Sequence, residues 1–310
     1  MDEYEKKILA AVDGSVYSSN SLDYLIRLFR QDQNFNVDLL AAVSTCCGDQ
    51  SWMSDVDGQR PENSVVLQRK AKAQRYLRDA KKRLVRNEFP EENITTIVHA
   101  SGEGITGSIY HFAKENMYDG LLVGRRGVGR VGEMLLGSVS ADLVRKCHEI
   151  PLWIIDGNVT STRFLLAVHT CTHSLMAADH LAFILQNNPK AEICIYHSLA
   201  AFGSTPPTET EEFHNRWGAK WCEKHLDMET CLYKAHSQIL IENGISEQRI
   251  VQLPPRRGLH PSHDLLRQAK RYKCGTIVIG RRPRVDKGLL GGVSDRTTKK
   301  AQNMAVWLVG

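Results

Sequence analysis

The stretch Val123-Gly124-Arg125-Arg126 recurs as Ile279-Gly280-Arg281-Arg282, 156 residues further along the chain, and this repeat decides the fold. Three further blocks recur in the same order around it. Residues 11–15 correspond to 167–171 at the same offset, whereas 135–140 correspond to 289–294 and 153–155 to 307–309 at an offset of 154. A long-period repeat of this kind indicates two copies of one structural unit.

Each unit alternates short apolar runs with longer amphipathic segments, which is typical of parallel strands joined by crossover helices. The first unit predicts strands at residues 7–12, 37–43, 94–98, 120–124 and 151–155, and helices at 18–31, 62–88, 103–117 and 138–148. The second unit predicts strands at 163–168, 191–196, 248–252, 275–279 and 304–309, and helices at 172–187, 209–243, 260–272 and 293–302.

The predicted fold is therefore α/β, with two tandem, open-twisted, five-stranded parallel sheets of Rossmann-like form. A polar stretch from Asp156 to Thr162 lies between the complete units, so we expect domains at 1–156 and 163–310 and a linker at 157–162. Each unit ends on a fifth strand with an open edge. We expect residues 152–155 and 306–309 to cover each other in an internal pseudo-dimer, and a homodimer of such chains stays open as a further association.

Composition and charge fit a globular chain without a membrane partner. The 310 residues are 42% hydrophobic and 24% charged, and no stretch approaches the roughly 18 apolar residues of a membrane span. The eight cysteines include no Cys-x-x-Cys pair, so we expect reduced, mostly buried thiols in a cytoplasmic protein. There are 20 basic and 22 acidic residues up to Asp156, and 20 and 13 beyond it. The basic excess is concentrated in residues 249–300.

The segment after the fourth predicted strand, residues 124–140, carries the features of an anion site. In an open parallel sheet, ligands bind beyond the carboxyl ends of the strands. Gly124 and Gly127 let the backbone approach a ligand, and Gly137-Ser138 opens a helix whose free N–H groups and dipole suit a phosphate. The hydroxyls of Ser138 and Ser140 could add hydrogen bonds. The same residues also fit a flexible connection in which Ser138 is a plain N-cap.

Two other phosphate-binding motifs do not fit this segment. Residues 127–132 satisfy G-x-G-x-x-G, but a dinucleotide fingerprint belongs directly after a first strand and needs an acid about 20 residues later. A P-loop needs a lysine between its last glycine and Ser138, and none is present.

On these residues the chain resembles the universal stress protein family in its tandem-domain form. The nucleotide-binding branch carries the pattern G-x2-G-x9-G-[S/T], which Gly124, Gly127, Gly137 and Ser138 meet with the right spacing. The family also opens with an apolar strand ending in Asp, as at Asp13, and closes each domain with an apolar strand. The resemblance is strong for residues 5–156 and weak for 163–310.

The resemblance implies an ATP-binding first domain, with Mg²⁺ or Mn²⁺ as the accompanying cation. Asp13 would contact the nucleoside, and Ala42 or Val43 would line the adenine pocket. Ribose and phosphates would be held by the residues of the glycine segment, namely Gly124, Gly127, Gly137, Ser138, Val139 and Ser140.

The second copy departs from this pattern, so we expect its nucleotide motif to be degenerate. Asp13 is replaced by His169, Gly127 by Pro283 and Ser138 by Gly292, and the nine-residue spacer shrinks to seven. Proline lacks an N–H and fixes φ, so it cannot replace a glycine that approaches a ligand. The basic residues Arg281, Arg282, Arg284 and Lys287 leave another anion, or a solvated basic loop, as the alternatives.

Other candidate sites are weaker. His169-Thr170-Cys171-Thr172-His173 offers three metal ligands, but a closed zinc site needs a fourth, so we expect no metal site. Residues 69–86 hold nine Lys or Arg and one acid, yet Ala71, Leu77, Leu84 and Val85 predict an apolar stripe and no aromatic platform accompanies it. We therefore expect a solvated helix face and no nucleic-acid partner.

Three functions remain open from the sequence. The leading hypothesis is a non-catalytic, ATP-binding stress-response protein in which nucleotide orders residues 125–137 and changes a surface for an unknown protein partner. The first alternative is a slow ATPase or autophosphorylating enzyme with Ser138 or Ser140 as acceptor. The second alternative is a nucleotide-free scaffold that uses the basic surface of residues 249–300.

Overall fold

The computed structural model describes residues 5–45, 64–126, 136–200, 209–227, 232–282 and 292–310. Its centre is one sheet of ten strands in the order β3-β2-β1-β4-β5-β10-β9-β6-β7-β8. The strands are β1 (Lys6–Ala11), β2 (Phe35–Ser44), β3 (Ile94–Ser101), β4 (Gly120–Gly124), β5 (Leu152–Ile155), β6 (Arg163–Ala167), β7 (Glu192–Tyr196), β8 (Ile250–Gln252), β9 (Thr276–Gly280) and β10 (Ala305–Val309). All ten strands predicted from the sequence are confirmed.

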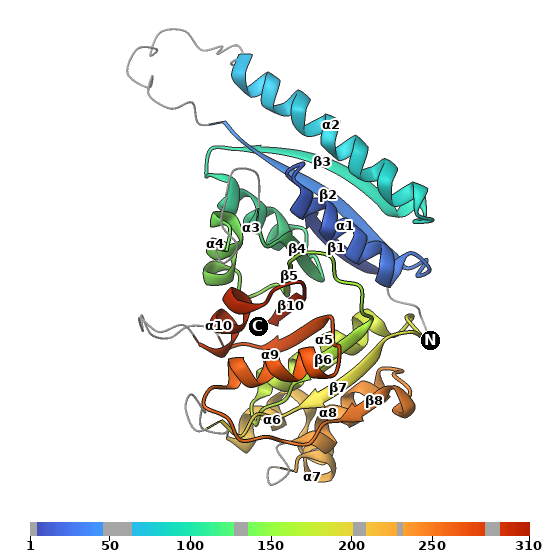
Figure 1. Cartoon of the computed structure of the whole chain (residues 1–310), viewed down its shortest axis with the longest axis vertical. Helices are drawn as coiled ribbons and strands as arrows, with labels where there is room; N and C mark the ends of the chain where they lie inside the picture. The colour runs from blue at the N-terminus through green and yellow to red at the C-terminus, as the bar shows by residue number, and fades with distance from the viewer. Residues whose placement is uncertain (1–4, 46–63, 127–135, 201–208, 228–231, 283–291) are drawn as a thin grey trace.

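The sheet has two halves with the same strand order. The first half is β1 to β5 and the second half is β6 to β10, and pairing within each half is parallel. The sequence predicted two sheets with residues 152–155 and 306–309 covering each other. The structure confirms this contact, since β5 pairs with β10, and the pairing is antiparallel and joins the two predicted sheets into one. Figure 1 shows the halves stacked along the long axis of the molecule.

Helices cover both faces of the sheet, in the three-layer arrangement of a doubly wound fold. One face is covered by α1 (Val16–Phe29), α2 (Ser64–Arg86), α5 (Thr172–Leu185), α6 (Thr210–Trp217), α7 (Ala219–His225) and α8 (Tyr233–Glu242). The opposite face is covered by α3 (Ile105–Glu115), α4 (Ser138–Lys146), α9 (Pro261–Arg271) and α10 (Val293–Lys300).

The single helix predicted over residues 209–243 is wrong. Gly218 separates α6 from α7 with φ at +80°, a left-handed conformation that glycine adopts without the strain of a side chain. The helix α8 then begins only at Tyr233. The amphipathic pattern continues across these breaks, so it gave no sign of them.

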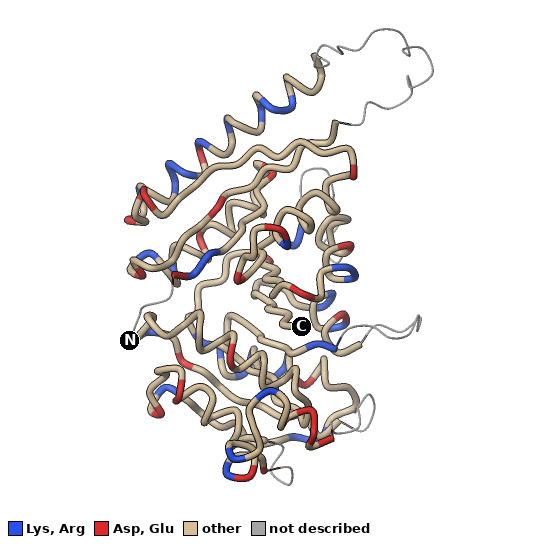
Figure 2. The backbone as a smooth tube through the Cα atoms, turned by 180° about the vertical axis from the view of Figure 1, so that it is seen from behind, with Lys and Arg blue, Asp and Glu red and all other residues tan. Residues whose placement is uncertain are grey.

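Helix α2 carries basic residues along its length, as Figure 2 shows, and most of them are exposed. Its buried residues are Val66, Ala73, Leu77, Ala80 and Leu84, which form the apolar stripe. The predicted stripe was right at Leu77 and Leu84 but wrong at Ala71, which is exposed while Ala73 packs inward.

Buried aromatic rings hold the two halves together at the β5–β10 junction. Trp153 and Trp307 are register partners, and their rings stack with centroids 3.9 Å apart and an interplanar angle of 2°. His180 on α5 lies beside both rings, and its Nε2 accepts a hydrogen bond of 3.2 Å from Trp153 Nε1. On the same face, the hydroxyls of Tyr24 and Thr276 lie 2.9 Å apart across the junction.

The repeated arginines also cross the junction. Arg125 is 1% exposed, pairs with Asp156 at 3.3 Å, and donates to the carbonyl oxygens of Lys299 and Ala301 at the end of α10. Arg281, its counterpart in the repeat, donates to Val144 O in α4 at 2.9 Å. An arginine from each half therefore contacts the C-terminal end of the last helix of the other half: Arg125 contacts α10, and Arg281 contacts α4. A positive charge is favourable at the C-terminal end of a helix. Arg281 is thus a junction residue as well as a neighbour of the predicted anion loop.

Two further observations concern the cysteines and the apolarity of the helices. The five cysteines of the described chain, Cys147, Cys171, Cys194, Cys222 and Cys274, are buried and unpaired, as predicted for reduced thiols. In the described residues, none of the helices has the length and apolarity needed to span a bilayer.

Candidate functional site

The residues predicted to bind nucleotide lie along one edge of the first half of the sheet. Asp13 follows β1, Ala42 and Val43 lie near the end of β2, and Gly124 ends β4. These strands are neighbours, because β1 pairs with both β2 and β4. The chain leaves β1 for α1 on one face and β4 for α4 on the other, so this edge is the topological switch point where open α/β sheets bind ligands.

Asp13 is exposed and held in a turn that starts α1. Its Oδ1 accepts a hydrogen bond of 2.9 Å from the backbone N–H of Ser15, and Ser15 Oγ caps the helix by accepting from Ser18 N at 3.2 Å. Gly14 between them has φ of +76°, and a Cβ there would lie 3.1 Å from the ring of Tyr76.

Tyr76 is a neighbour of this site that sequence reasoning missed. It lies on α2 beside Asp13 and Gly14, and burial together with the negative charge of Asp13 raises the pKa of its hydroxyl. A tyrosine on a basic helix, far away in the sequence, carries no motif that links it to the glycine segment.

Gly124 and Gly137 lie close to the backbone of other segments. A Cβ on Gly124 would lie 3.1 Å from the backbone carbonyl of Tyr17 in α1. A Cβ on Gly137 would lie 3.1 Å from Arg125 O, which also accepts a hydrogen bond of 2.8 Å from Gly137 N. Because these glycines allow close backbone contacts, the start of α4 lies next to the end of β4.

Ser138 and Ser140 differ in whether their hydroxyl groups can reach a ligand. Ser140 is 3% exposed, and its hydroxyl donates to Gly124 O at 2.7 Å, so it ties α4 to β4. Ser138 is exposed at the first position of α4, and Val139 beside it is partly buried. The N–H groups of the first turn have no intrahelical partners and can face a ligand. Gly127 lies outside the described residues.

A well-formed pocket lies at the corresponding edge of the second half. Its volume is about 620 Å³, within the range of small-molecule sites. It is lined by the repeat counterparts of seven predicted residues, namely His169, Ser198, Leu199, Gly280, Gly292, Val293 and Ser294. The sequence predicted a degenerate motif here, and the structure nevertheless has a cavity at this position.

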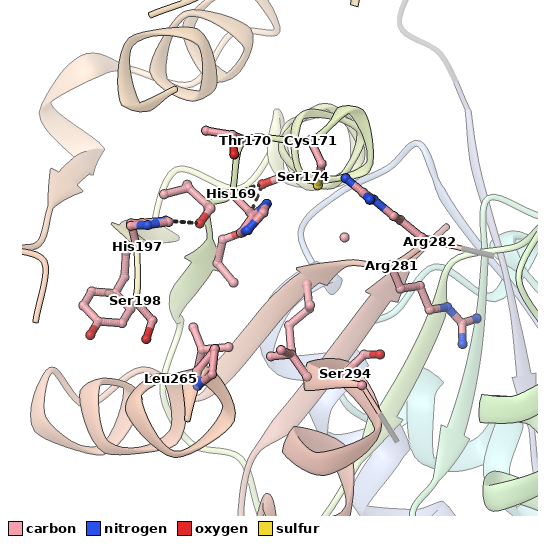
Figure 3. A pocket seen from close by; sticks show the side chains of 18 of the residues that line it. His169, Thr170, Cys171, Ser174, His197, Ser198, Leu265, Arg281, Arg282 and Ser294 are labelled. Carbon is pink, nitrogen blue, oxygen red and sulfur yellow. Dashed lines mark hydrogen bonds between the residues drawn. The ribbon is translucent and has the colours of Figure 1, made fainter. Parts of the chain in front are cut away.

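Two histidines and an arginine set the electrostatics of this pocket. Figure 3 shows the imidazole of His169 between His197 and Arg282. The rings of His169 and His197 have centroids 6.1 Å apart, and His197 Nδ1 donates to Val168 O at 2.9 Å, which fixes the tautomer of that ring. Burial, followed by the charges of His197 and Arg282, lowers the pKa of His169 to about 4. His169 is therefore neutral at pH 7.

Ser174 anchors the floor of the pocket to the core behind it. Its hydroxyl lies 2.7 Å from Nε2 of the buried His236, whose Nδ1 donates to Leu232 O at 2.6 Å. Ser174 Oγ also accepts from the backbone N–H of His169 at 2.9 Å. These bonds hold the end of β6 and the start of α5 in place, so His169 is presented by a rigid backbone.

The His169-Thr170-Cys171-Thr172-His173 stretch is not gathered as a metal site. Within the described residues, no group of three or more His, Cys, Asp or Glu side chains is placed to hold a metal ion. Cys171 instead precedes α5, and Arg282 approaches its thiol.

Solved structures similar to this chain include universal stress proteins, and those with TM-scores above 0.5 share its fold. A universal stress protein from Archaeoglobus fulgidus is 16% identical, with a TM-score of 0.66 over 98% of this chain and 97% of that chain. A functionally unknown protein from Pseudomonas aeruginosa is 14% identical, with a TM-score of 0.53 over 99% of this chain and 93% of that chain. A universal stress protein in complex with cAMP is 21% identical, with a TM-score of 0.35 over 48% of this chain and 96% of that chain. No curated protein matches the sequence.

The sequence model of the Universal stress protein family matches residues 5–156. This match covers the strands and helices of the first half, including the predicted nucleotide residues. Residues 5–156, just under half of the chain, are therefore similar in sequence to the universal stress protein family.

Proposed function

We propose that this protein is a tandem universal stress protein that binds ATP in its first half and acts by binding rather than by catalysis. Residues 1–156 and 163–310 are its two domains, packed as an internal pseudo-dimer. The observation that carries the proposal is the convergence of Asp13, Gly124 and the start of α4 at the switch point between β1 and β4.

The residues at this edge fit an adenine nucleotide. The exposed carboxylate of Asp13 can accept hydrogen bonds from ribose hydroxyls, while either Ala42 or Val43, which pack on opposite faces of the sheet, would line the base. Ser138 and the first N–H groups of α4 can hold phosphate oxygens, because a helix N-terminus favours negative charge. A divalent cation, Mg²⁺ or Mn²⁺, would offset the charge of the triphosphate. The predicted ordering of residues 125–137 by nucleotide falls mostly outside the described residues, and in this proposal nucleotide binding changes the surface offered to a partner in a stress response.

Titration calorimetry of the full chain with ATP and Mg²⁺ tests this function. We expect one site per chain and at least a tenfold weaker affinity for Asp13→Ala, because a hydrogen bond to a charged group contributes about 1.5–3 kcal/mol. His169→Ala is the matched control at the corresponding position of the second half and should leave the affinity unchanged. Absence of ATP binding, or equal loss in both variants, contradicts the proposal.

The exposure of Ser138 favours one form of the enzymatic alternative. If the bound nucleotide transfers its γ-phosphoryl group to the protein, Ser138 is the better acceptor, since the hydroxyl of Ser140 is buried and bonded to Gly124 O. Incubation with ATP labelled at the γ-phosphate decides this. Label that stays on the wild type and on Ser140→Ala but is lost in Ser138→Ala supports transfer, and no retained label supports binding alone.

A further inference from the structure

The outer strand of the first half leaves a long edge of the sheet open. β3 is a terminal strand in the sheet order, and within the described residues the main chain of 95–100 makes no backbone hydrogen bond apart from its ladder to β2. β3 is eight residues long and contains no Lys, Arg, Asp, Glu or Pro, the residues that usually protect an exposed edge. At the other end of the sheet β8 has three residues. The edge of β3 is therefore the better template for a further strand.

A groove of about 640 Å³ lies between α2 and β3. Figure 1 shows α2 lying along β3 at one end of the molecule. Thr96 and Val98, at alternate positions of the strand, line the groove, and Leu77 and Val85 of α2 add apolar surface. The groove thus borders the open edge along the same face of the strand.

The lining of this groove is positively charged. It contains four basic residues, Arg78, Lys81, Lys82 and Arg86, and one acid, Glu91. Lys81 lies 3.4 Å from Glu91 and donates to Ile94 O at 3.2 Å, so these two charges offset each other. The side chains of Arg78, Lys82 and Arg86 are exposed and form no hydrogen bond or ion pair with another described residue.

The acids around α2 leave this excess of positive charge in place. Asp23 is bonded to Arg83, which does not line the groove, and Glu88 lies 3.7 Å from Arg30. Asp79 belongs to α2 but is not part of the lining. The groove therefore presents three cations to whatever binds at the edge of β3.

These three cations are spaced to meet alternate residues of an extended chain. Arg78, Lys82 and Arg86 follow one another at intervals of four residues in α2, which is about 6 Å along a helix axis. Side chains on one face of a strand are about 6.6–6.8 Å apart. Acids at every second position of an added strand would therefore each lie near one cation.

We propose that α2 and β3 form a docking site for an extended, acidic segment of a partner protein, with an acid at every second position. The main chain of the segment pairs with the free edge of β3, and its carboxylates meet Arg78, Lys82 and Arg86. This surface shares no residue with the predicted nucleotide edge at Asp13 and Gly124, so it does not depend on the nucleotide proposal.

Two other occupants fit this surface less well. A second copy of this chain, paired through β3, would bring two basic α2 helices together on one face of the sheet, and their charges would repel. A single-stranded nucleic acid would need rings on which its bases stack, and the described lining of the groove holds no aromatic side chain.

Fluorescence anisotropy of the full-length protein with a labelled nine-residue peptide tests this proposal. In the probe, Glu alternates with Val and Thr. Replacing every Glu with Gln removes the charge, and two adjacent prolines at the centre remove main-chain N–H groups, so both changes should weaken binding at least tenfold. A nine-nucleotide single-stranded DNA, the alternative polyanion, should bind more weakly than the acidic peptide.

Two double variants of α2 locate the charge contacts. Arg78→Gln with Lys82→Gln removes two cations of the groove and should weaken the acidic peptide at least fivefold. Lys72→Gln with Arg75→Gln removes the same charge from exposed positions of the same helix outside the groove, and should change the affinity less than twofold. Circular dichroism and thermal melting confirm that both variants are folded.

Two further measurements locate the added strand. Thr96→Glu places an acid in the groove and should weaken binding at least fivefold, whereas Thr95→Glu places the same charge at the adjacent exposed position, outside the lining, and should have less effect. In hydrogen-exchange mass spectrometry, the peptide should slow exchange in residues 94–101 and leave residues 250–252 unchanged.

Four results would overturn the proposal. They are failure of the acidic peptide to bind at millimolar concentration, equal weakening by the two double variants of α2, binding without slower exchange in β3, and tighter binding of the DNA than of the peptide. Asp13→Ala should leave peptide binding intact, so failure of this proposal is distinguishable from failure of the nucleotide site.

Discussion

Replacing Arg125 with methionine should be among the most destabilising changes at the junction between the halves. The guanidinium is buried, pairs with Asp156 at 3.3 Å, and donates to two carbonyl oxygens at the end of α10. Methionine keeps the apolar stem but leaves those acceptors without a donor. Asp156 Oδ2 retains one hydrogen bond of 3.0 Å from Asn303 N.

The expected magnitude follows from these contacts. Removing one partner of a buried ion pair costs about 3–5 kcal/mol because the other charge is left buried. We therefore expect Arg125→Met to lower the free energy of unfolding by about 3–5 kcal/mol. Arg281→Met should cost less, about 1 kcal/mol, because Arg281 donates one hydrogen bond and its Nε and Nη2 have no partner among the described residues.

Urea unfolding followed by circular dichroism measures these changes. Arg145→Met is the matched control, because Arg145 is an exposed arginine of α4 whose pair with Asp142 should contribute less than about 1 kcal/mol. The reasoning is refuted if Arg125→Met costs no more than Arg145→Met, since the buried arginine would then contribute nothing to joining the halves.

Three further predictions concern stability. Trp153→Ala removes the ring stacked on Trp307 and should lower the free energy of unfolding by about 3–5 kcal/mol in urea, and a loss under 1 kcal/mol would contradict the packing. Gly14→Ala places a Cβ at positive φ against the ring of Tyr76 and should cost about 1–2 kcal/mol in the same assay, so an unchanged midpoint would argue against this turn. Burial lowers the pKa of His180 from 6.5 to about 3, so its contribution to stability is complete above pH 6.5 and is lost as pH falls toward 3. His180→Gln keeps an acceptor for Trp153 Nε1 and should reduce the stability lost between pH 7 and pH 5 by about 2 kcal/mol, whereas an unchanged loss would contradict the assignment.

The repeat made the architecture predictable. The pairs of recurring blocks located equivalent strands in both halves, and apolar runs such as Ile8 to Val12 identified them as buried and parallel. The pairing of the two fifth strands followed from the need to cover an open edge. The break at Gly218 was missed because a single glycine inside an amphipathic pattern is tolerated in many helices.

Only those parts of the candidate site that belong to a recognisable sequence motif could be predicted. The spacing of Gly124, Gly137 and Ser138 indicated the start of α4, but a glycine motif does not reveal that Gly124 packs closely on the backbone of Tyr17. The role of Arg125 in the junction depends on carbonyls more than 170 residues away in the sequence, which no local pattern encodes. The loss of motif residues in the second half suggested a lost site, although the cavity is formed mainly by strand ends that the repeat preserves.

A crystal structure of the full chain grown with ATP and Mg²⁺ tests the central claim most directly. The account predicts triphosphate density at the edge between β1 and β4, with Asp13 at the nucleoside and the start of α4 at the phosphates. Density for ATP in the pocket at His169 alone, or at neither edge under saturating ATP, would contradict it.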